Sequence, residues 1–452
     1  MASSTLHFFF LLALLLPSTL TTATRDTCTT AAPDGSDDLS IIPVNARCSP
    51  FAANPTSTSV MDTVLHMASA DSHRLAYLSS LVADKPNRTS VPVASANQLL
   101  HTGNYVVRAR LGTPPQLMFM VLDTSNDAVW LPCTGCSGCS TTANTSYFNP
   151  NSSSTYSTVS CSTSQCTQAR GLTCPSSSSS PPSVCSFNQS YGGGSSFSAS
   201  LVQDTLTLAS DVISNFSFGC INSASGNSLP PQGLMGLGRG PTSLISQTTS
   251  LYSGVFSYCL PSFRSFYFSG SLKLGPMGQP RSIRYTPLLR SSHRPSLYFV
   301  NLTGVSVGRT QIPVDPTYLT FDSNSGAGTI IDSGTVITRF VQPVYEAIRD
   351  EFRNQVKGPF SSLGAFDTCF AADSDNLAPK VTLHMTSLDL KLPVENTLIH
   401  SSAGTLACLS MAGIPLNANA ALNVIANLQQ QNLRILFDVP NSRLGIATEA
   451  CN

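Results

Sequence analysis

The chain has 452 residues, of which 24 are basic and 24 acidic, so its formal net charge is zero. This length is sufficient for two domains and a sizeable core, while the balanced charge excludes the electrostatic signature of a nucleic-acid-binding or acidic-membrane-binding protein. Only 11% of the residues are charged, and the many Ser, Thr, Asn and Gly residues are typical of a secreted β protein.

The N-terminus carries the features of a secretory signal peptide over residues 1–23. Residues 8–16 form an apolar run that is too short to span a bilayer, and small residues follow it at 21–23. The sequence shows no second long apolar run and no C-terminal lipid-anchor tail. We therefore predict a mature protein outside the cytosol that has neither a membrane nor a nucleic acid as partner.

Cysteines and glycosylation acceptors fit an oxidising compartment. Two of the fourteen cysteines, Cys28 and Cys48, lie early, and twelve lie from Cys133 onward, so both groups are even and can form disulfides. The predicted disulfide cysteines of the mature part are Cys133, Cys136, Cys139, Cys161, Cys166, Cys174, Cys185, Cys220, Cys259, Cys369, Cys408 and Cys451. The Asn-x-Ser/Thr acceptors are Asn87, Asn144, Asn151, Asn188, Asn215 and Asn301.

We interpret residues 24–100 as a pro-segment that is removed on maturation. Apolar spacing predicts one amphipathic helix over 61–83, and Pro86 and Pro92 mark a linker after it. From residue 105 the pattern becomes β, with a predicted hairpin of strands 105–111 and 117–122. The Ser/Thr/Cys-rich stretch 133–190 lacks the apolar residues to pack alone, so it is interpreted as a disulfide-stapled insertion. A zinc or iron–sulfur site at its first three cysteines is the open alternative.

The remaining elements follow in chain order. A glycine-rich hairpin tip is predicted at 191–196, strands at 216–220 and 233–238, and a helix near 243–249. The second half has strands at 296–302 and 304–308, a clear helix at 344–355 and a return to β structure at 381–392. Residues 304–308 match the G-x-S-x-G pattern of serine hydrolases, but no helix is predicted to follow the serine, so a hairpin is favoured over a nucleophile elbow.

Two similar stretches, 118–125 and 326–335, end an apolar run abruptly in Asp, a hydroxyl residue and a small residue. An acidic residue at the end of a buried strand is usually a turn residue, because a desolvated carboxylate is costly without a partner. Two copies indicate an internal duplication. Duplicated halves that face each other bring Asp123 and Asp332 together as a two-carboxylate acid–base site.

The two Asp motifs, Trp130, the flap-like Tyr191-Gly-x-Gly-Ser and the cysteine-rich insertion resemble pepsin-like aspartic proteases. The insertion, together with 256–259 and 429–432, is similar to the plant nepenthesin-type branch and to its secreted, apoplastic aspartyl proteases. The resemblance implies a mainly all-β, bilobal fold with a few short helices. Its N-terminal lobe would span 101–275 with the insertion at 133–190 and the flap, and its C-terminal lobe 276–452.

The resemblance also implies residue roles. Asp123 and Asp332 would be catalytic and hydrolyse peptide bonds through an activated water at acid pH, with no metal and no cofactor. Support for the dyad would come from Thr124, Ser125, Ser333, Gly334 and Thr335, while Tyr191 and Trp130 would belong to the flap and substrate region. The protein would be a monomer acting on polypeptides in the apoplast, or in the vacuole. The implied disulfides are 133–136, 139–220, 161–185, 166–174, 259–451 and 369–408.

Three positions depart from the family pattern. Ser125 stands where Gly is usual, Asn126 where Ser is common, and Ala426 where the second lobe usually has Gly. The competing hypothesis is therefore a weakly active or inactive binding protein on the same fold, similar to plant xylanase inhibitors. A purely structural wall protein would require the Asp pair to be accidental.

Overall fold

The computed structural model describes residues 39–43, 49, 60–82, 105–140, 147–168, 171–174, 183–191, 195–226, 229, 233–263, 270–356, 358–372, 378–401, 403–415 and 421–451. Strands dominate these residues, and most helices are short, which confirms the mainly all-β fold class. The predicted signal peptide lies outside the described residues. Of the predicted pro-segment, a strand and a long helix are described.

The first half consists mostly of antiparallel strands. Its elements are β1 (Leu39–Pro43), α1 (Val60–Val82), β2 (Tyr105–Leu111), β3 (Gln116–Asp123), β4 (Trp130–Ser137), η1 (Pro150–Ser152), β5 (Ser157–Thr158), α2 (Ser164–Gln168), β6 (Leu172–Thr173), β7 (Ser186–Tyr191), β8 (Ser195–Leu208), β9 (Asp211–Ser225), β10 (Leu234–Gly236), α3 (Leu244–Gln247), α4 (Thr249–Tyr252), β11 (Val255–Cys259) and β12 (Gly270–Leu274). The predicted hairpin 105–122 is present as β2 and β3. The helix expected near 243–249 is divided into α3 and α4.

The second half repeats this organisation around one long helix, α5. Its elements are β13 (Arg284–Leu289), β14 (Phe299–Val300), β15 (Leu302–Val307), β16 (Thr310–Gln311), η3 (Pro316–Tyr318), β17 (Gly328–Ile331), β18 (Thr338–Phe340), α5 (Gln342–Val356), β19 (Ser361–Leu363), β20 (Phe366–Ala371), β21 (Val381–Met385), β22 (Leu388–Lys391), α6 (Val394–Thr397), β23 (Leu398–His400), β24 (Leu406–Leu409), β25 (Met411–Gly413), β26 (Leu422–Ile425), α7 (Asn427–Gln430), β27 (Leu433–Asp438) and β28 (Arg443–Thr448).

The predicted internal duplication is visible in the strand register. In the first half, β10 pairs in parallel with β3 and antiparallel with β4. In the second half, β26 pairs in parallel with β17 and antiparallel with β18. Each Asp therefore leaves a strand whose parallel neighbour arrives from much later in the same half. This crossing places both aspartates at equivalent points of two related sheets.

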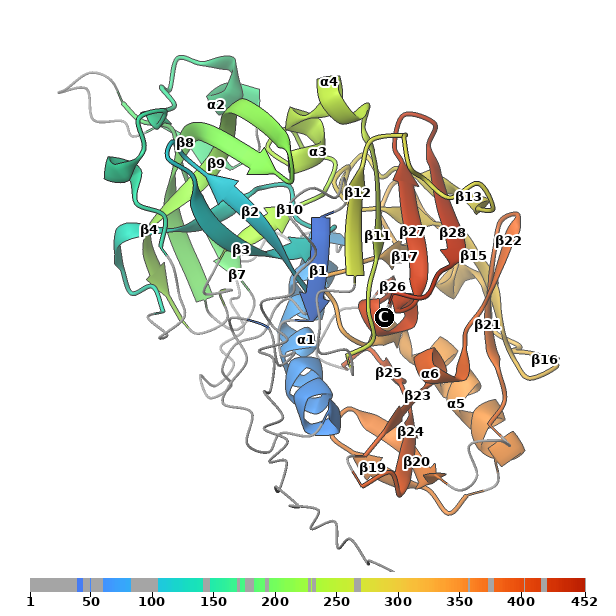
Figure 1. Cartoon of the computed structure of the whole chain (residues 1–452). Coiled ribbons are helices and arrows are strands. Elements are labelled where there is room, and N and C mark those ends of the chain that lie inside the picture. Colours follow the sequence, from blue (N-terminus) through green and yellow to red (C-terminus); the bar gives the residue numbers. More distant parts are fainter. Residues whose placement is uncertain are drawn as a thin grey trace, which may run out of the picture.

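A shared sheet connects the two halves. Strand β1 pairs with β2 on one side and with β12 on the other, and β12 continues through β11, β27 and β28 to β13. Figure 1 shows β1 and α1, both in blue, between the cyan-green first half and the orange-red second half. Sequence analysis predicted α1 to within one residue at each end but did not anticipate β1 as part of this sheet.

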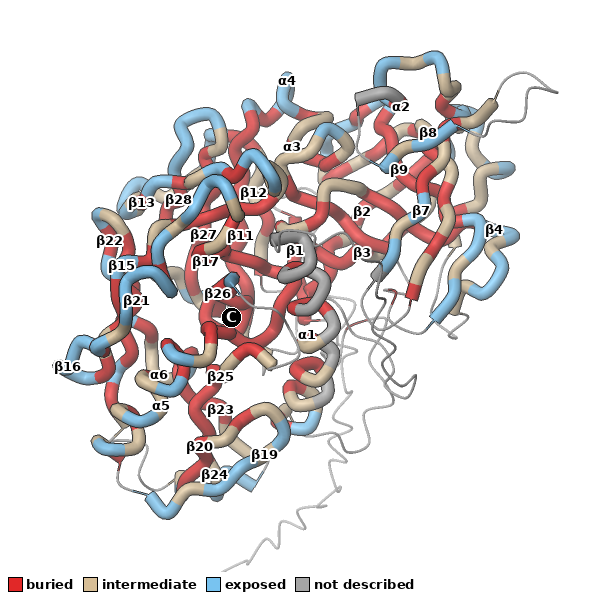
Figure 2. The backbone as a smooth tube through the Cα atoms, turned by 180° about the vertical axis from the view of Figure 1, so that it is seen from behind, coloured by how far each residue is buried: buried red, intermediate tan, exposed pale blue. Residues whose placement is uncertain are grey.

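Burial follows the same plan. The strands at the middle of the molecule, among them β2, β3, β17 and β26, are largely buried, whereas the outer segments near β16 and β22 carry exposed residues (Figure 2). Helix α1 contributes Met61, Val64 and Met67 to one apolar cluster with Val336 and Ile337. It contributes Leu75 and Leu78 to a second cluster with Phe299. The helix is therefore packed onto the second half along most of its length.

The disulfides correct part of the pairing that the family resemblance implied. Cys259–Cys451 and Cys369–Cys408 are present as expected. The other bonds are Cys133–Cys220, Cys136–Cys139, Cys161–Cys174 and Cys166–Cys185, so the implied 133–136, 139–220, 161–185 and 166–174 bonds are wrong.

Strand register explains the Cys133–Cys220 bond. Strand β4 runs parallel to β9, which places the Cys133 and Cys220 Cα atoms 5.5 Å apart. In the insertion, Cys166 and Cys174 are each bonded to another cysteine, yet their sulfurs lie only 3.6 Å apart, so the observed and the implied pairings lie close together in space. Cys133, Cys136 and Cys139 are all disulfide-bonded, so they offer no thiolates to the alternative zinc or iron–sulfur site.

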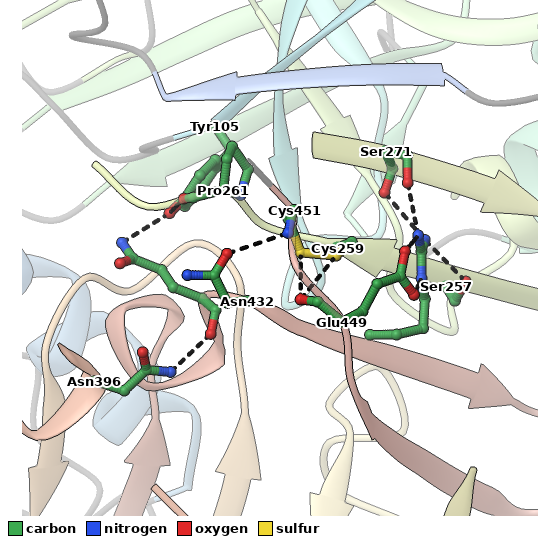
Figure 3. Close-up of a disulfide and its surroundings, with 11 residues drawn as sticks. Tyr105, Ser257, Cys259, Pro261, Ser271, Asn396, Asn432, Glu449 and Cys451 are labelled. Atoms are coloured by element: carbon green, nitrogen blue, oxygen red, sulfur yellow. Dashed lines mark hydrogen bonds and ion pairs between the residues drawn. A yellow bond between two sulfur atoms is a disulfide. The ribbon is translucent and has the colours of Figure 1, made fainter. Parts of the chain in front are cut away.

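The Cys259–Cys451 bond attaches the end of the chain to the shared sheet (Figure 3). Beside it, the Asn432 side chain accepts a hydrogen bond from the Cys451 backbone N–H at 3.2 Å. The buried Arg434 guanidinium donates to Glu449 at 2.9 Å and to the Ser271 hydroxyl at 2.7 Å. Strand β12, the neighbour of β1, is thereby connected to the C-terminal strands.

Candidate active site

Asp123 and Asp332 lie at the ends of equivalent strands and are both fully buried. Asp123 is the last residue of β3, and Asp332 directly follows β17. Their side chains face one point: a single nitrogen, Nη2 of Arg74, is 2.8 Å from Asp123 Oδ1 and 3.2 Å from Asp332 Oδ1. The two carboxylates are therefore close enough to share one bound atom, as the sequence predicted.

Thr124 and Ser333 brace the two loops against each other. The Ser333 backbone N–H donates to Thr124 Oγ1 at 3.0 Å, and the Thr124 backbone N–H donates to Ser333 Oγ at 3.2 Å. Ser333 Oγ also donates to the Leu122 carbonyl at 3.2 Å. These reciprocal bonds across the duplication satisfy buried polar groups and hold the carboxylates at a constant separation.

The third position of each motif supplies a backbone donor to its carboxylate. Ser125 N–H donates to Asp123 Oδ1 at 2.8 Å, and Gly334 N–H donates to Asp332 Oδ1 at 3.1 Å. Asp332 receives a further bond from Thr335 Oγ1 at 2.6 Å. Asp123 receives one from the Ser125 hydroxyl at 3.0 Å. Asp332 has a second, longer hydroxyl donor in Thr124 Oγ1 at 3.4 Å. Both aspartates thus have one amide donor and at least one hydroxyl donor, although the hydroxyls come from different positions.

The three unusual residues fit their backbone conformations. Ser125 is not among the residues with positive φ, so its loop does not require glycine. Ala426 has φ −92° and ψ 173°, which any residue adopts. Asn126 Oδ1 accepts from the Ala128 backbone N–H at 3.2 Å. Besides its backbone N–H, Ser125 donates its hydroxyl to Asp123.

Helix α1 places Arg74 directly on the dyad. Its guanidinium donates from Nη1 to Asp123 Oδ2 at 3.1 Å and from Nε to Asp332 Oδ2 at 3.1 Å, besides the two Nη2 contacts. It also donates to Ser125 Oγ at 2.6 Å and to Thr335 Oγ1 at 3.1 Å. The Arg74 side chain is only 6% exposed. A planar fork of donors suits this arrangement, since it can bond both carboxylates at once.

One helical turn earlier, Asp71 attaches α1 to the second motif. Its carboxylate accepts from the Val336 backbone N–H at 2.9 Å and from the Ile337 backbone N–H at 3.0 Å. Burial raises the pKa of Asp71 from 3.8 to about 7, an effect opposed by the nearby Arg339 and Arg74 charges and by these hydrogen bonds. A carboxylate that bonds two backbone N–H groups fixes the helix in register, so that Arg74 reaches the dyad.

Sequence analysis missed four polar residues of the site. Arg74 and Asp71 come from the predicted pro-segment, and Gln430 and Asn427 come from α7. Gln430 Nε2 donates to the Asp332 carbonyl at 3.1 Å, and Asn427 Nδ2 donates to the Ser333 carbonyl at 2.8 Å. The available signal was an acidic and a basic residue three positions apart on the otherwise apolar face of the predicted helix.

The flap and its base are formed by β7 and β8, which pair from Ser186 to Tyr191. Tyr191 is the last residue of β7, at the predicted hairpin tip, and its side chain is not described. Trp130 is fully buried beneath this hairpin, with its ring centroid 4.8 Å from that of Phe197. The structure thus places Trp130 under the flap rather than at a surface that a substrate touches.

A cavity of about 420 Å³ begins beside the dyad. Ser125 and Asp127 line it from the first half, Gln189 from the flap strand, and 293–297 from the second half. The cavity lies between the two halves, next to Ser125.

The predicted glycosylation acceptors differ in accessibility. Asn151, Asn188 and Asn215 are exposed, whereas Asn301 is half-buried and its amide donates to Thr386 Oγ1 at 2.9 Å. Asn87 and Asn144 lie outside the described residues. Within the described part of the chain, none of the helices combines the length and apolar character needed to span a bilayer.

Comparisons with known proteins identify relatives of this chain. The family model described as "Xylanase inhibitor N-terminal" matches residues 105–276, and "Xylanase inhibitor C-terminal" matches 297–448. The chain is 84% identical to Aspartyl protease AED3 of Arabidopsis thaliana, over all of both chains. It is 36% identical to Aspartic proteinase nepenthesin-1 of Nepenthes gracilis, over 77% of this chain and 78% of that protein.

The solved structures that resemble it share the fold at low identity. Basic 7S globulin from soybean superposes with a TM-score of 0.60 over 79% of this chain and 96% of that chain, at 21% identity. Such a likeness concerns the fold alone.

Proposed function

We propose, on the premise that this chain belongs to the pepsin-like aspartyl protease family of plants, that it is a secreted precursor whose mature form hydrolyses peptide bonds with the Asp123–Asp332 pair. Its enzyme class is that of the aspartic endopeptidases. The observation that carries the proposal is one nitrogen within hydrogen-bond distance of both buried carboxylates. In the mature enzyme, the nucleophilic water takes this position.

The reaction follows from the electrostatics of two adjacent carboxylates. Two negative charges this close cannot both form cheaply, so the pair holds one proton, as the two aspartates of pepsin do. The ionised carboxylate takes a proton from the water as it attacks the peptide carbonyl, and the protonated carboxylate donates to the developing oxyanion. The two carboxylates share this proton, which is not assigned to either aspartate. Acid pH favours the singly protonated state.

Helix α1 supports an inhibited precursor. Arg74 occupies the position of the water and neutralises the two carboxylates, so neither water nor substrate reaches them. Removal of residues up to the predicted boundary near 100 would also remove β1 from the shared sheet. Activation therefore requires that α1 leaves the cleft and that another segment covers or replaces β1.

Polypeptides are the proposed substrates, and the apoplast is the proposed location. The signal peptide, the even cysteine count and the described disulfides support an oxidising compartment outside the cytosol. We propose that an extended peptide lies along the cavity beside Ser125, which Gln189 of β7 also lines. We expect the mature protein to be a monomer.

The second candidate is a binding protein without catalysis, which the xylanase-inhibitor description of the matching models favours. The experiment that separates the two uses the matured protein and denatured globin at acid pH. We expect cleavage that pepstatin blocks and that Asp332→Asn abolishes. Xylanase inhibition by the matured protein is measured in parallel. Unchanged globin cleavage in Asp332→Asn would overturn the dyad assignment, and inhibition without cleavage would establish the binding protein.

A further inference from the structure

A second constellation of catalytic side chains lies away from the dyad, on the sheet formed by β16, β15, β21 and β22. Its strand register pairs Ser306 with Gln311, Gly304 with His384, and His384 with Asp389. Directly opposed residues of antiparallel strands share a face. Gln311, Ser306, His384 and Asp389 therefore form a polar row across all four strands, while Val305 and Leu383, which alternate with them, are buried.

The hydrogen bonds of this row have the order of a serine hydrolase triad. Ser306 Oγ lies 2.7 Å from His384 Nε2, and His384 Nδ1 lies 2.7 Å from Asp389 Oδ1. The hydrogen bond from His384 holds the pKa of Asp389 below its ordinary value, so Asp389 is an ionised acceptor. Nδ1 must then carry a proton. In the neutral ring, Nε2 is left to accept the proton of the Ser306 hydroxyl.

The G-x-S-x-G motif around Ser306 does not form a nucleophile elbow. Ser306 lies within β15 and the chain turns at Gly308, which has φ +60°, so the predicted hairpin is confirmed. Triads occur on unrelated folds and are recognised by geometry rather than by local motif. Here His384 and Asp389 come from the next hairpin, 78 and 83 residues further along the chain.

Gly304 and Gln311 complete the surroundings of the nucleophile. A Cβ on Gly304 would lie 3.0 Å from Gln311 Nε2 and 3.8 Å from His384 Cδ2, so glycine leaves room for the amide beside the imidazole. Gln311 stands opposite Ser306 in the register. A side-chain amide in this position is a donor of the type that stabilises the oxyanion of acyl transfer.

We propose that Ser306, His384 and Asp389 form a second, serine-type site that hydrolyses small acyl esters, with Gln311 as the oxyanion donor. The row is open to solvent, since the His384 and Asp389 side chains are 27% and 54% exposed. Such a surface favours short acyl groups, because a long acyl chain would need a deep apolar pocket.

The steps balance without a cofactor. Ser306 Oγ attacks the ester carbonyl while His384 Nε2 takes the hydroxyl proton. Collapse of the tetrahedral intermediate breaks the ester bond, and His384 gives the proton to the departing alcohol. Water then attacks the acyl-serine by the same route and releases the carboxylic acid, which restores Ser306.

The test uses the secreted full-length chain carrying Asp332→Asn, which removes peptidase activity from the measurement. The probes are a fluorophosphonate, whose fluoride departs as Ser306 is phosphonylated, and 4-nitrophenyl acetate. We expect labelling that peptide mass spectrometry locates to Ser306 and that Ser306→Ala abolishes. His384→Gln should slow both reactions by about 10²-fold or more, as loss of a general base does. Gln311→Ala should slow ester hydrolysis.

Thr310→Ala, next to Gln311 on the exposed strand β16, is the matched control and should leave both rates unchanged. Thermal unfolding of each variant reports whether the sheet is intact. Labelling that falls on another serine, or a rate that His384→Gln leaves unchanged in a folded chain, would overturn the proposal. In the chain with Asp332 intact, Ser306→Ala should not alter globin cleavage after maturation, which separates this site from the proposed peptidase.

Discussion

The two aspartate motifs of this protein share a backbone plan but differ in the side chains that surround it. Each carboxylate accepts an N–H from the residue two positions later, through Ser125 in the first motif and Gly334 in the second. Hydroxyl donors come from Ser125 itself in one, and from Thr335 and Thr124 in the other. The comparison teaches that the third position supplies its backbone donor whether it is Ser or Gly.

The same difference affects how helix α1 is held. A Cβ on Gly334 would lie 2.3 Å from Arg74 Nη2, so glycine is required there for the arginine to enter. On the other side, Ser125 accepts a 2.6 Å hydrogen bond from the same nitrogen. The second motif also binds Asp71 through the backbone of Val336 and Ile337. The second half therefore makes most of the contacts that hold α1, and the first motif makes the remaining ones.

The largest effect is expected from Arg74→Ala in the unprocessed chain. Removing one partner of a buried ion cluster costs about 3–5 kcal/mol. Here this loss destabilises the docked state of α1. The unprocessed chain should therefore cleave a fluorogenic peptide on the order of 10²–10³-fold faster, with intact mass confirming that no processing has occurred. Arg74→Lys, which keeps the charge without the fork, is the matched control with a smaller gain. If the unprocessed Arg74→Ala chain did not cleave the peptide faster, the helix itself, and not the arginine side chain, would be what blocks the cleft.

Asp71→Asn tests the attachment to the second motif alone. The docked pKa of Asp71 is about 7, against an ordinary value of 3.8, so the docked state binds the proton more tightly. Above pH 7 the docked carboxylate is ionised, and its burial destabilises the docked state of α1 by about 4 kcal/mol. This cost decreases as the pH falls from about 7 to about 4, because the docked carboxylate is then protonated. The opening free energy of α1 from hydrogen exchange should lose this pH dependence in Asp71→Asn. An unchanged slope would mean that another group controls it.

A smaller effect is expected from Thr335→Val, which removes the shorter of the two hydroxyl donors of Asp332. Hydrogen bonds to charged groups contribute about 1.5–3 kcal/mol, so kcat of the mature enzyme should fall roughly 10- to 10²-fold while KM changes little. Steady-state kinetics on one peptide at several pH values measure this. Thr335→Ser keeps the hydroxyl and should retain most of the activity, whereas equal losses in both variants would point to packing.

The smallest effect is expected from Ser125→Gly, which restores the usual third residue of the first motif. Because the backbone N–H to Asp123 remains, the mature activity should be preserved or raised, with a change of less than about tenfold, the equivalent of about 1.4 kcal/mol. Peptide hydrolysis by the matured variant measures it. A large loss would show that the Ser125 hydroxyl is needed, and Ser125→Gly combined with Asn126→Ser should then recover activity.

Much of the proposed active site was predictable from local sequence pattern. The apolar runs that end in Asp-Thr and Asp-Ser identified both carboxylates, and their similarity indicated the duplication that brings them together. The hydroxyls of Thr124 and Ser333 were expected to brace the loops, and they do so across the two halves. The helix over 61–83 and a hairpin at 304–308 were also expected, because local periodicity and turn residues specify such elements.

The contacts between distant segments were decided only by the tertiary structure. Arg74 is 258 residues from Asp332, and the Ser306 hydroxyl meets an imidazole 78 residues away. The Cys133–Cys220 disulfide depended on the parallel register of β4 with β9, which spacing along the chain does not reveal. The sequence by itself determined which residues can do chemistry. Folding decided which of them meet, because the pairing of strands and the burial of one helix face depend on the whole chain at once.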